Sequence, residues 1–476
     1  MPAATLGLWD YLLGGSPCVV LLAACVVATG NYALLSSRSG MYNFAFANQN
    51  VPFLVPSFTL SVSALGSICL LGLPAIALAT STVAWLWAIP ACFCAGLVGY
   101  FIFTPMLYYV GATSIHEYIH KRFRTRKCKL SAALLRYYCS IYYMIYSGVL
   151  VVTQAVIAAE LIRFLLSNVP PWLPGLLTCV LATLLAASGG ISTIHIFSTA
   201  GILYFLASLA ALICIKSRQT EFTANPMEKY LYESFLGRQN LISATHFSGF
   251  GCFLFGFTIF GYFLCCDQST LHCLGCILSF KKARGAQILG SIVWPTLFLL
   301  LALFTTLLAY PSLTAKCLTY NTSGHNDFAI TYIDKVFHDF LTILSNYTAL
   351  RGLLLAAVLC VILVSASLKV LSLTVVTYED FISKCVPKQD PISDRTPEKF
   401  LLIALTLVFG LCLGVIKKTH RPETNQSPRK PKRKGKTKSN SLNRYPSSFR
   451  ASNLPDTSYY NANVKHCQKL QLETTM

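Results

Sequence analysis

The sequence predicts an all-α polytopic membrane protein, and its composition, its long apolar runs and its uneven charge all point to this class. Of the 476 residues, 54% are hydrophobic and only 12% are charged, which is unlike the usage of a soluble enzyme. The net charge of +20 is concentrated near the C-terminus. Long apolar runs recur along most of the chain, so a lipid bilayer is its expected solvent.

Nine apolar runs are long enough to cross a bilayer as helices, because a crossing needs about 20 residues. A tenth run, 400–416, is shorter and precedes two lysines, so we expect a partial or re-entrant segment there. Residues 1–416 are therefore predicted to form a transmembrane domain of about 9–10 spans. The nine runs lie at about 18–36, 51–79, 82–110, 131–166, 170–188, 195–216, 244–266, 286–310 and 350–377.

The lysines and arginines of the short loops predict an extracellular N-terminus. The segments 112–130 and 279–285 are basic and are expected in the cytosol, whereas the residues before the first run are not basic. The same orientation places the glycosylation sequons at Asn321 and Asn346 outside the cell. We therefore expect a multi-pass glycoprotein of the plasma membrane.

The last segment of the chain, 417–476, is expected to be a disordered cytosolic tail. It holds 14 Lys and Arg against 3 Asp and Glu, a net charge of +11, and has too few apolar residues to form a core. A basic cluster just after a membrane segment favours contact with anionic lipid. Nucleic acid is not an expected partner of a polytopic protein.

The second apolar run is interrupted by Gly66, Gly72 and Pro74. Glycine and proline loosen or break a helix, and the freed backbone groups must then face protein or a water-filled cavity. A broken span early in the chain is typical of the binding site of a secondary transporter. We therefore expect Ser63, Gly66 and Ser67, with Gly72 and Pro74, to line a cavity. The alternative is an ordinary helix that only bends.

Lys369 is the most unusual residue in any predicted span. It shares one helix face with Ser365 and Ser372, at i, i+4 and i+7. A buried lysine is costly in a membrane and marks a functional site. It could replace a coupling cation or hold an anionic substrate; alternatively, its long side chain could extend to the interface.

Several other polar residues receive simpler interpretations. Asp267 is either an ion or proton site or a solvated helix cap, and Arg136 and His195 are expected at the membrane interface. Cys273 and Cys276 have the C-x-x-C spacing, but no second pair accompanies them, so we predict no metal site. We find no hydrolase, P-loop or dinucleotide motif, and therefore expect no enzyme activity.

Four segments together resemble the sodium:solute symporter family, especially its monocarboxylate, multivitamin and iodide branch. Residues 112–123 resemble a T-S-x-x-E-Y-L-x-x-R-F motif, and 71–74 resemble the L-G-x-P of a broken first core helix. Residues 188–191 resemble the glycine turn between the fourth and fifth core helices, and 377–380 the T-x-E-D end of the eighth. The resemblance covers about 18–414.

This resemblance implies two inverted five-helix repeats preceded by one extra N-terminal helix. The second repeat is expected to be incomplete, because the resemblance stops midway through the ninth core helix. The implied function is secondary active transport by alternating access, in which sodium is the coupling ion. The implied substrate is a small organic anion or vitamin-like solute.

The sequence departs from the family where the second sodium ion is expected. The hydroxyl positions of the eighth core helix align with Leu363 and Val364, which cannot bind a cation, although Ser365 and Ser367 are near. In the fifth core helix, the usual Asp is Ser198. Two alternatives therefore remain: a sodium-independent carrier, and a transporter-derived regulatory or interaction protein that carries no solute.

Overall fold

The computed structural model describes residues 41–64, 66, 87–123, 129–165, 170, 172–219, 249–297, 299 and 348–383. All of them belong to one unit of the chain, Met1–Arg421. These residues are predominantly helical, and the β structure among them is an isolated bridge between Asn50 and Ile277. The predicted all-α class is confirmed. The five-plus-five repeat, its extra helix and its incomplete second half stay predictions.

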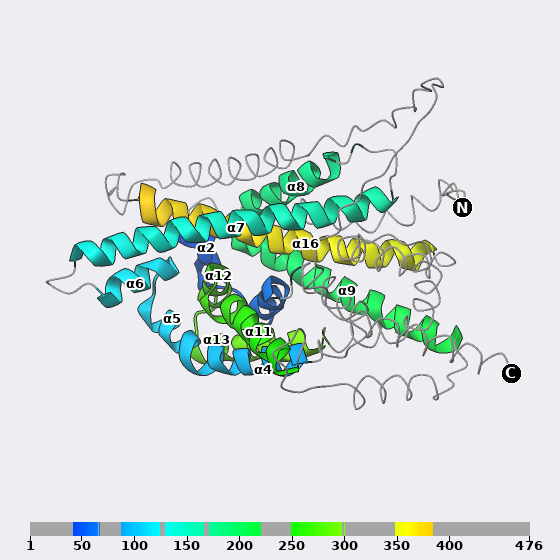
Figure 1. Cartoon of the computed structure of the whole chain (residues 1–476), viewed down its shortest axis with the longest axis horizontal. Coiled ribbons are helices and arrows are strands. Elements are labelled where there is room, and N and C mark those ends of the chain that lie inside the picture. Colours follow the sequence, from blue (N-terminus) through cyan, green and yellow to red (C-terminus); the bar gives the residue numbers. More distant parts are fainter. Residues whose placement is uncertain are drawn as a thin grey trace, which may run out of the picture. The chain divides into compact units, whose positions relative to one another are not determined.

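The longer observed helices lie in the predicted apolar runs (Figure 1), whereas the helices Met41–Phe46, Ile115–Phe123 and Gln268–Gly275 lie between them. An unlabelled helix, Leu54–Ala64, lies in the second run. The others are α2 (Met41–Phe46), η1 (Ala47–Gln49), α4 (Ala88–Val98), η3 (Gly99–Phe103), α5 (Thr104–Val110), α6 (Ile115–Phe123), α7 (Lys129–Leu165), α8 (Leu173–Gly189), α9 (Ile191–Gln219), α11 (Gly249–Gly261), η4 (Tyr262–Cys266), α12 (Gln268–Gly275), α13 (Phe280–Ile288), η5 (Leu289–Val293), α16 (Thr348–Thr377) and η7 (Tyr378–Ile382).

Four helices of the described part are long and apolar enough to cross a membrane. A fifth candidate is a bent pair, Phe250–Cys266 and Gln268–Gly275, whose axes differ by 46°. The protein is therefore a multi-pass membrane protein, as predicted. The four helices are Ala88–Val110, Leu130–Ala159, Ile191–Ser208 and Ala356–Ile382.

Several predictions lie outside the described residues and stay predictions. They concern the runs 18–36 and 400–416, the tail 417–476, the sequons at Asn321 and Asn346, and the cavity residues Ser67, Gly72 and Pro74.

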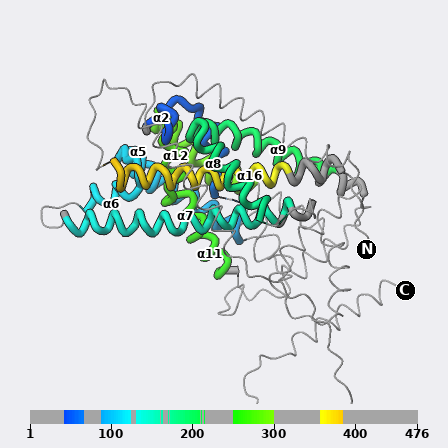
Figure 2. Tube along the Cα trace, turned by 90° about the horizontal axis from the view of Figure 1, so that it is seen from above, coloured from blue at the N-terminus to red at the C-terminus, as the bar shows by residue number. Residues whose placement is uncertain are grey.

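Helix α16 lies at the centre of the described helices. It packs against α9, α7 and α8, and Figures 1 and 2 both show the yellow helix running alongside α7 and α9. Its side chains from Ala356 to Val376 are nearly all enclosed. A helix of mostly apolar surface can face lipid as well as protein. The buried polar residues Ser365, Lys369 and Ser372 of α16 need partners inside the protein, and this explains why α16 is surrounded.

A second group of helices packs through small residues. A Cβ atom added at Gly256 of α11 would lie 3.0 Å from the Ala91 Cβ of α4, and one at Gly96 of α4 would lie 2.9 Å from Ser291 Oγ of η5. Helices in a membrane associate largely through close packing, which small residues permit. This packing holds the bent pair α11–α12 against α4.

Four short segments, η3, η4, η5 and η7, have π-helical winding. Such segments interrupt the regular hydrogen-bond ladder and are frequent at functional sites. In η4, side chains satisfy two of the carbonyls: Thr270 Oγ1 donates to Phe263 O at 2.7 Å, and Gln287 Nε2 donates to Leu264 O at 3.1 Å. Irregular backbone inside a membrane requires such internal partners.

The expected cytosolic loop 112–130 contains a helix that we did not predict. Gly111 ends α5 with a left-handed backbone, φ +55°, and α6 then begins at Ile115. The Glu117 carboxylate accepts a hydrogen bond from Thr113 N at 3.3 Å, at the start of α6. A short helix with this many charged residues does not show the long apolar pattern on which our span predictions rested.

The turn between α8 and α9 depends on Gly190. Its backbone has φ +60° and ψ −139°, a region that essentially only glycine adopts. A Cβ atom there would lie 2.3 Å from the Phe44 carbonyl oxygen. We expect Gly190→Ala to lower the free energy of unfolding by about 2–4 kcal/mol, from backbone strain and the clash together. Thermal unfolding of the purified protein in detergent measures this.

Gly111→Ala is the matched control for this prediction. Gly111 also has a positive φ, +55°, but a Cβ atom there would meet nothing within 4 Å. Its replacement should cost only the strain of about 1–2 kcal/mol. Equal losses in the two variants would contradict the close approach to Phe44.

Candidate functional site

Gly66, in the second predicted span, has a left-handed backbone with φ +47°. It follows the helix Leu54–Ala64 along the chain. A Cβ atom on Gly66 would lie 3.7 Å from Ser365 Oγ of α16. Ser63, in the last turn of the same helix, is buried, and its hydroxyl has no hydrogen-bond partner among the described residues. Gly66 therefore lies beside Ser365 of α16, and the buried Ser63 hydroxyl lies one turn before it.

Ser365 is the hydroxyl of α16 that faces Gly66. It accepts a hydrogen bond from Gln154 Nε2 of α7 at 2.7 Å, while Gln154 Oε1 has no partner in the described part of the chain. Gln154 was missed by our sequence analysis, although a lone amide in an apolar span is a recognisable signal. Leu363 and Val364, which the family alignment placed here, pack in the apolar core.

Lys369 lies one helical turn from Ser365 and is fully enclosed, with 1% of its surface exposed. Its ammonium forms an ion pair with Asp267 and donates to Ser269 Oγ at 3.1 Å. The ring of Phe263 lies beneath it, 5.2 Å from Nζ, a favourable cation–π distance. The alternative in which Lys369 extends to the interface is therefore wrong.

Asp267 joins η4 to α12 and is 0% exposed. Its interpretation as a solvated cap is wrong, because the bend between α11 and α12 turns it inward to Lys369. The Tyr143 hydroxyl of α7 lies beside Asp267, with Ser147 and Ser372 as its other polar neighbours. The predicted stripe of Ser365, Lys369 and Ser372 is therefore enclosed by polar groups of α7 and α12.

His195 makes a separate buried contact. It is 1% exposed, and its Nδ1 lies 2.7 Å from Thr59 Oγ1 in the helix Leu54–Ala64. The prediction that His195 lies at the interface is wrong, because α9 begins at Ile191 inside the protein and not at its surface. The contact joins α9 to the helix that precedes Gly66.

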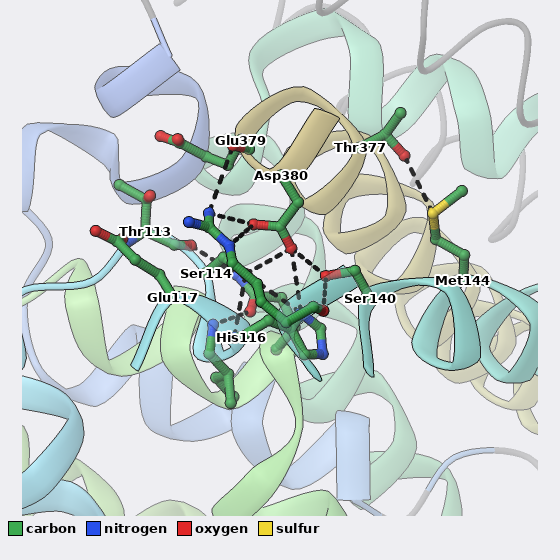
Figure 3. Close-up of polar contacts among 12 residues, drawn as sticks. Thr113, Ser114, His116, Glu117, Ser140, Met144, Thr377, Glu379 and Asp380 are labelled. Atoms are coloured by element: carbon green, nitrogen blue, oxygen red, sulfur yellow. Dashed lines mark hydrogen bonds and ion pairs between the residues drawn. The ribbon is translucent and has the colours of Figure 1, made fainter. Parts of the chain in front are cut away.

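A second buried ion pair joins Arg136 of α7 to Asp380 of η7. Figure 3 shows Asp380 with its polar neighbours Ser114, His116 and Ser140. Arg136 Nε donates to Asp380 Oδ1 at 2.8 Å, and Arg136 is only 8% exposed, so its prediction as an interfacial residue is wrong. The other carboxylate oxygen accepts hydrogen bonds from Ser140 and from Ser114, the latter at 3.3 Å. His116 Nδ1 lies 3.5 Å from the same oxygen.

Gln268 connects the two ion pairs. It follows Asp267 directly, and its side chain accepts from Ile115 N at 2.9 Å and donates to Thr113 O at 2.8 Å. The segment 112–123 is thereby held to α12 on one side and, through Ser114, to η7 on the other. These hydrogen bonds of Gln268 connect the buried pair of Lys369 and Asp267 to the start of α6.

An enclosed ion pair at the bend of a broken helix, with the left-handed backbone of Gly66 beside the same helix α16, is typical of a secondary transporter. The family model of the sodium:solute symporter family matches residues 44–420. The chain therefore belongs to that family.

Comparison with solved structures supports the same architecture. The chain is similar to a substrate-bound, outward-open structure of a Na+-coupled sialic acid symporter, with a TM-score of 0.68 and 13% sequence identity. The match covers 85% of this chain and 82% of the other. At this identity the likeness shows the fold alone. No curated protein matches the sequence.

The buried pair of Arg136 and Asp380 should be important for stability. We expect Arg136→Gln to lower the free energy of unfolding by about 3–5 kcal/mol, because Asp380 would stay buried without its charge partner. Thermal unfolding of the purified full chain in detergent checks this.

Lys121→Gln provides the control for this prediction. Lys121 pairs with Glu117 at 3.0 Å, but 48% of its side chain is exposed. Such surface pairs contribute about 0–1 kcal/mol, so this variant should unfold nearly as the wild type does. Equally small losses for Arg136→Gln and Lys121→Gln would show that Arg136 does not hold Asp380.

Proposed function

We propose that this protein is a sodium-coupled symporter for a small organic anion or vitamin-like solute of the monocarboxylate type. It would work by alternating access about Gly66 and the bend at Asp267. The plasma membrane is its proposed location, and the basic tail 417–476 its proposed contact with anionic lipid.

The observation that carries this proposal is the enclosed Lys369, whose partner Asp267 lies at the bend of a broken helix. A fixed positive charge inside a membrane protein favours an anionic solute. Family membership supports sodium coupling, and the symporter of similar fold is described as Na+-coupled.

Ser365 is the proposed sodium ligand of α16. Sodium is a hard cation that binds oxygen, and unwound backbone carbonyls commonly complete such sites. Ser365 Oγ faces the left-handed backbone at Gly66, whereas the Ser367 hydroxyl is used within α16, where it donates to Leu363 O at 2.6 Å. A shift of the family alignment by one residue, from Val364 to Ser365, restores one of the two expected hydroxyls.

Uptake of labelled solutes into cells that express the protein tests the proposed function. The panel comprises short-chain monocarboxylates, biotin, pantothenate, iodide and glucose, each measured in sodium and with choline in its place. We expect sodium-stimulated uptake of an anion. Uptake that is unchanged in choline would favour the sodium-independent carrier. If the protein is confirmed at the cell surface and no solute is taken up, the regulatory alternative is favoured.

Ser365→Ala should weaken sodium use. We expect the sodium concentration for half-maximal uptake to rise about tenfold, which corresponds to about 1.4 kcal/mol for one lost ligand. Ser367→Ala is the matched control, since its hydroxyl is bonded within its own helix. A similar rise in both variants, or none in Ser365→Ala, would exclude Ser365 as a ligand.

A further inference from the structure

Lys369 and Asp267 depend on each other for charge compensation. Both are almost completely enclosed, and in the part of the chain that the structure describes, each has the other as its ion-pair partner. Separating the two would leave two uncompensated charges in a membrane interior, which is strongly unfavourable. Any ligand that enters here must preserve the balance of charge.

Only one of the two Asp267 carboxylate oxygens has partners among the described residues. Its Oδ2 atom receives both the Lys369 ammonium and the Ser269 hydroxyl. Its Oδ1 atom is buried and accepts no hydrogen bond from any described residue. A bare carboxylate oxygen is an anionic acceptor of the kind that hard cations prefer.

Further oxygen atoms lie close to this carboxylate. The Tyr143 hydroxyl is its neighbour, and neither that hydroxyl nor the one of Ser147 has a hydrogen-bond partner among the described residues. The Ser372 hydroxyl donates to Leu368 O at 2.8 Å within α16. All four residues are buried. The region therefore offers two kinds of group: the donors Lys369 and Ser269, suited to an anion, and several oxygens, suited to a cation.

We infer that Lys369 and Asp267 form a charge-exchange site for a carboxylate anion and a sodium ion. The substrate carboxylate takes the place of Asp267 on Lys369 and Ser269. A sodium ion separate from the one proposed at Ser365 binds the released Asp267 carboxylate. This inference rests on the proposed function and specifies how the anion and the cation would be coupled.

The charge balance would oppose the entry of either ligand alone. An anion bound to Lys369 without sodium would leave Asp267 as an unpaired buried charge. Sodium bound to Asp267 without the anion would likewise leave Lys369 unpaired. When both bind, two neutral pairs replace one, so each ligand must raise the affinity for the other by the same factor.

The position of Asp267 links this exchange to movement of the helices. Asp267 lies at the bend between η4 and α12, and its release from Lys369 removes the ionic contact between α12 and α16. The neighbouring Gln268 holds the start of α6. Displacement of α12 would therefore be passed to the segment 112–123.

Equilibrium binding of ²²Na⁺ to the purified full chain tests the inference without knowledge of the substrate. In Lys369→Gln, the Asp267 carboxylate is free, so sodium affinity without any anion should be at least tenfold higher than in the wild type. The double variant Lys369→Gln/Asp267→Asn should lose this gain. This double variant also controls for folding, because it leaves neither Lys369 nor Asp267 as an unpaired buried charge. Equal sodium affinity in folded Lys369→Gln and the wild type would overturn the inference.

Asp267→Asn supplies a second test that does not depend on the folding of Lys369→Gln. Binding of labelled pantothenate, as the anion probe, should require sodium in the wild type and become independent of sodium in this variant. Sodium dependence that persists unchanged would overturn the inference. If uptake is stimulated by sodium but the sodium affinity of Lys369→Gln does not increase, the proposed function stands and this site is rejected. If the sodium affinity increases but no solute is taken up, the site stands and transport is rejected.

Discussion

A charged side chain enclosed by apolar helices needs an opposite charge beside it, and α16 with its extension η7 meets this requirement twice. Lys369 is paired with Asp267 at the bend before α12, and Asp380 with Arg136 of α7. The two pairs lie eleven residues apart along one continuous helix. They fix both the rotation and the axial position of α16, which its apolar side chains alone could not determine.

Much of the fold follows from hydrophobicity alone. The long runs predicted α7, α9, α11 and α16, because length and apolar content define a crossing independently of tertiary contacts. The charged helix α6 was missed for the same reason, since it has no apolar run. The π-helical segments were also missed, because their winding depends on partners from other helices, such as Gln287 for the Leu264 carbonyl.

The candidate site could be predicted only where a residue was unusual within its own segment. Lys369 stood out in an apolar span, and Gly66 in an interrupted one. Arg136 and His195 were misjudged, and one of the two interpretations of Asp267 was wrong, because position near the end of a run suggested contact with water. Their partners lie far away in the sequence, and a single sequence does not show which helices meet.

The π-helical winding of η4 also governs which way the following helix faces. A π segment accommodates one more residue than an α-helix over the same hydrogen-bonded stretch. Successive residues of an α-helix are separated by about 100° around its axis. If the five residues Tyr262–Cys266 rewound as α-helix, the backbone beyond them would turn by about 100°, little more than a quarter of a revolution, and Asp267 would face another neighbour. The winding of η4 therefore sets the direction in which the Asp267 carboxylate points. A change in one hydrogen-bonded turn would redirect it without unfolding α11 or α12.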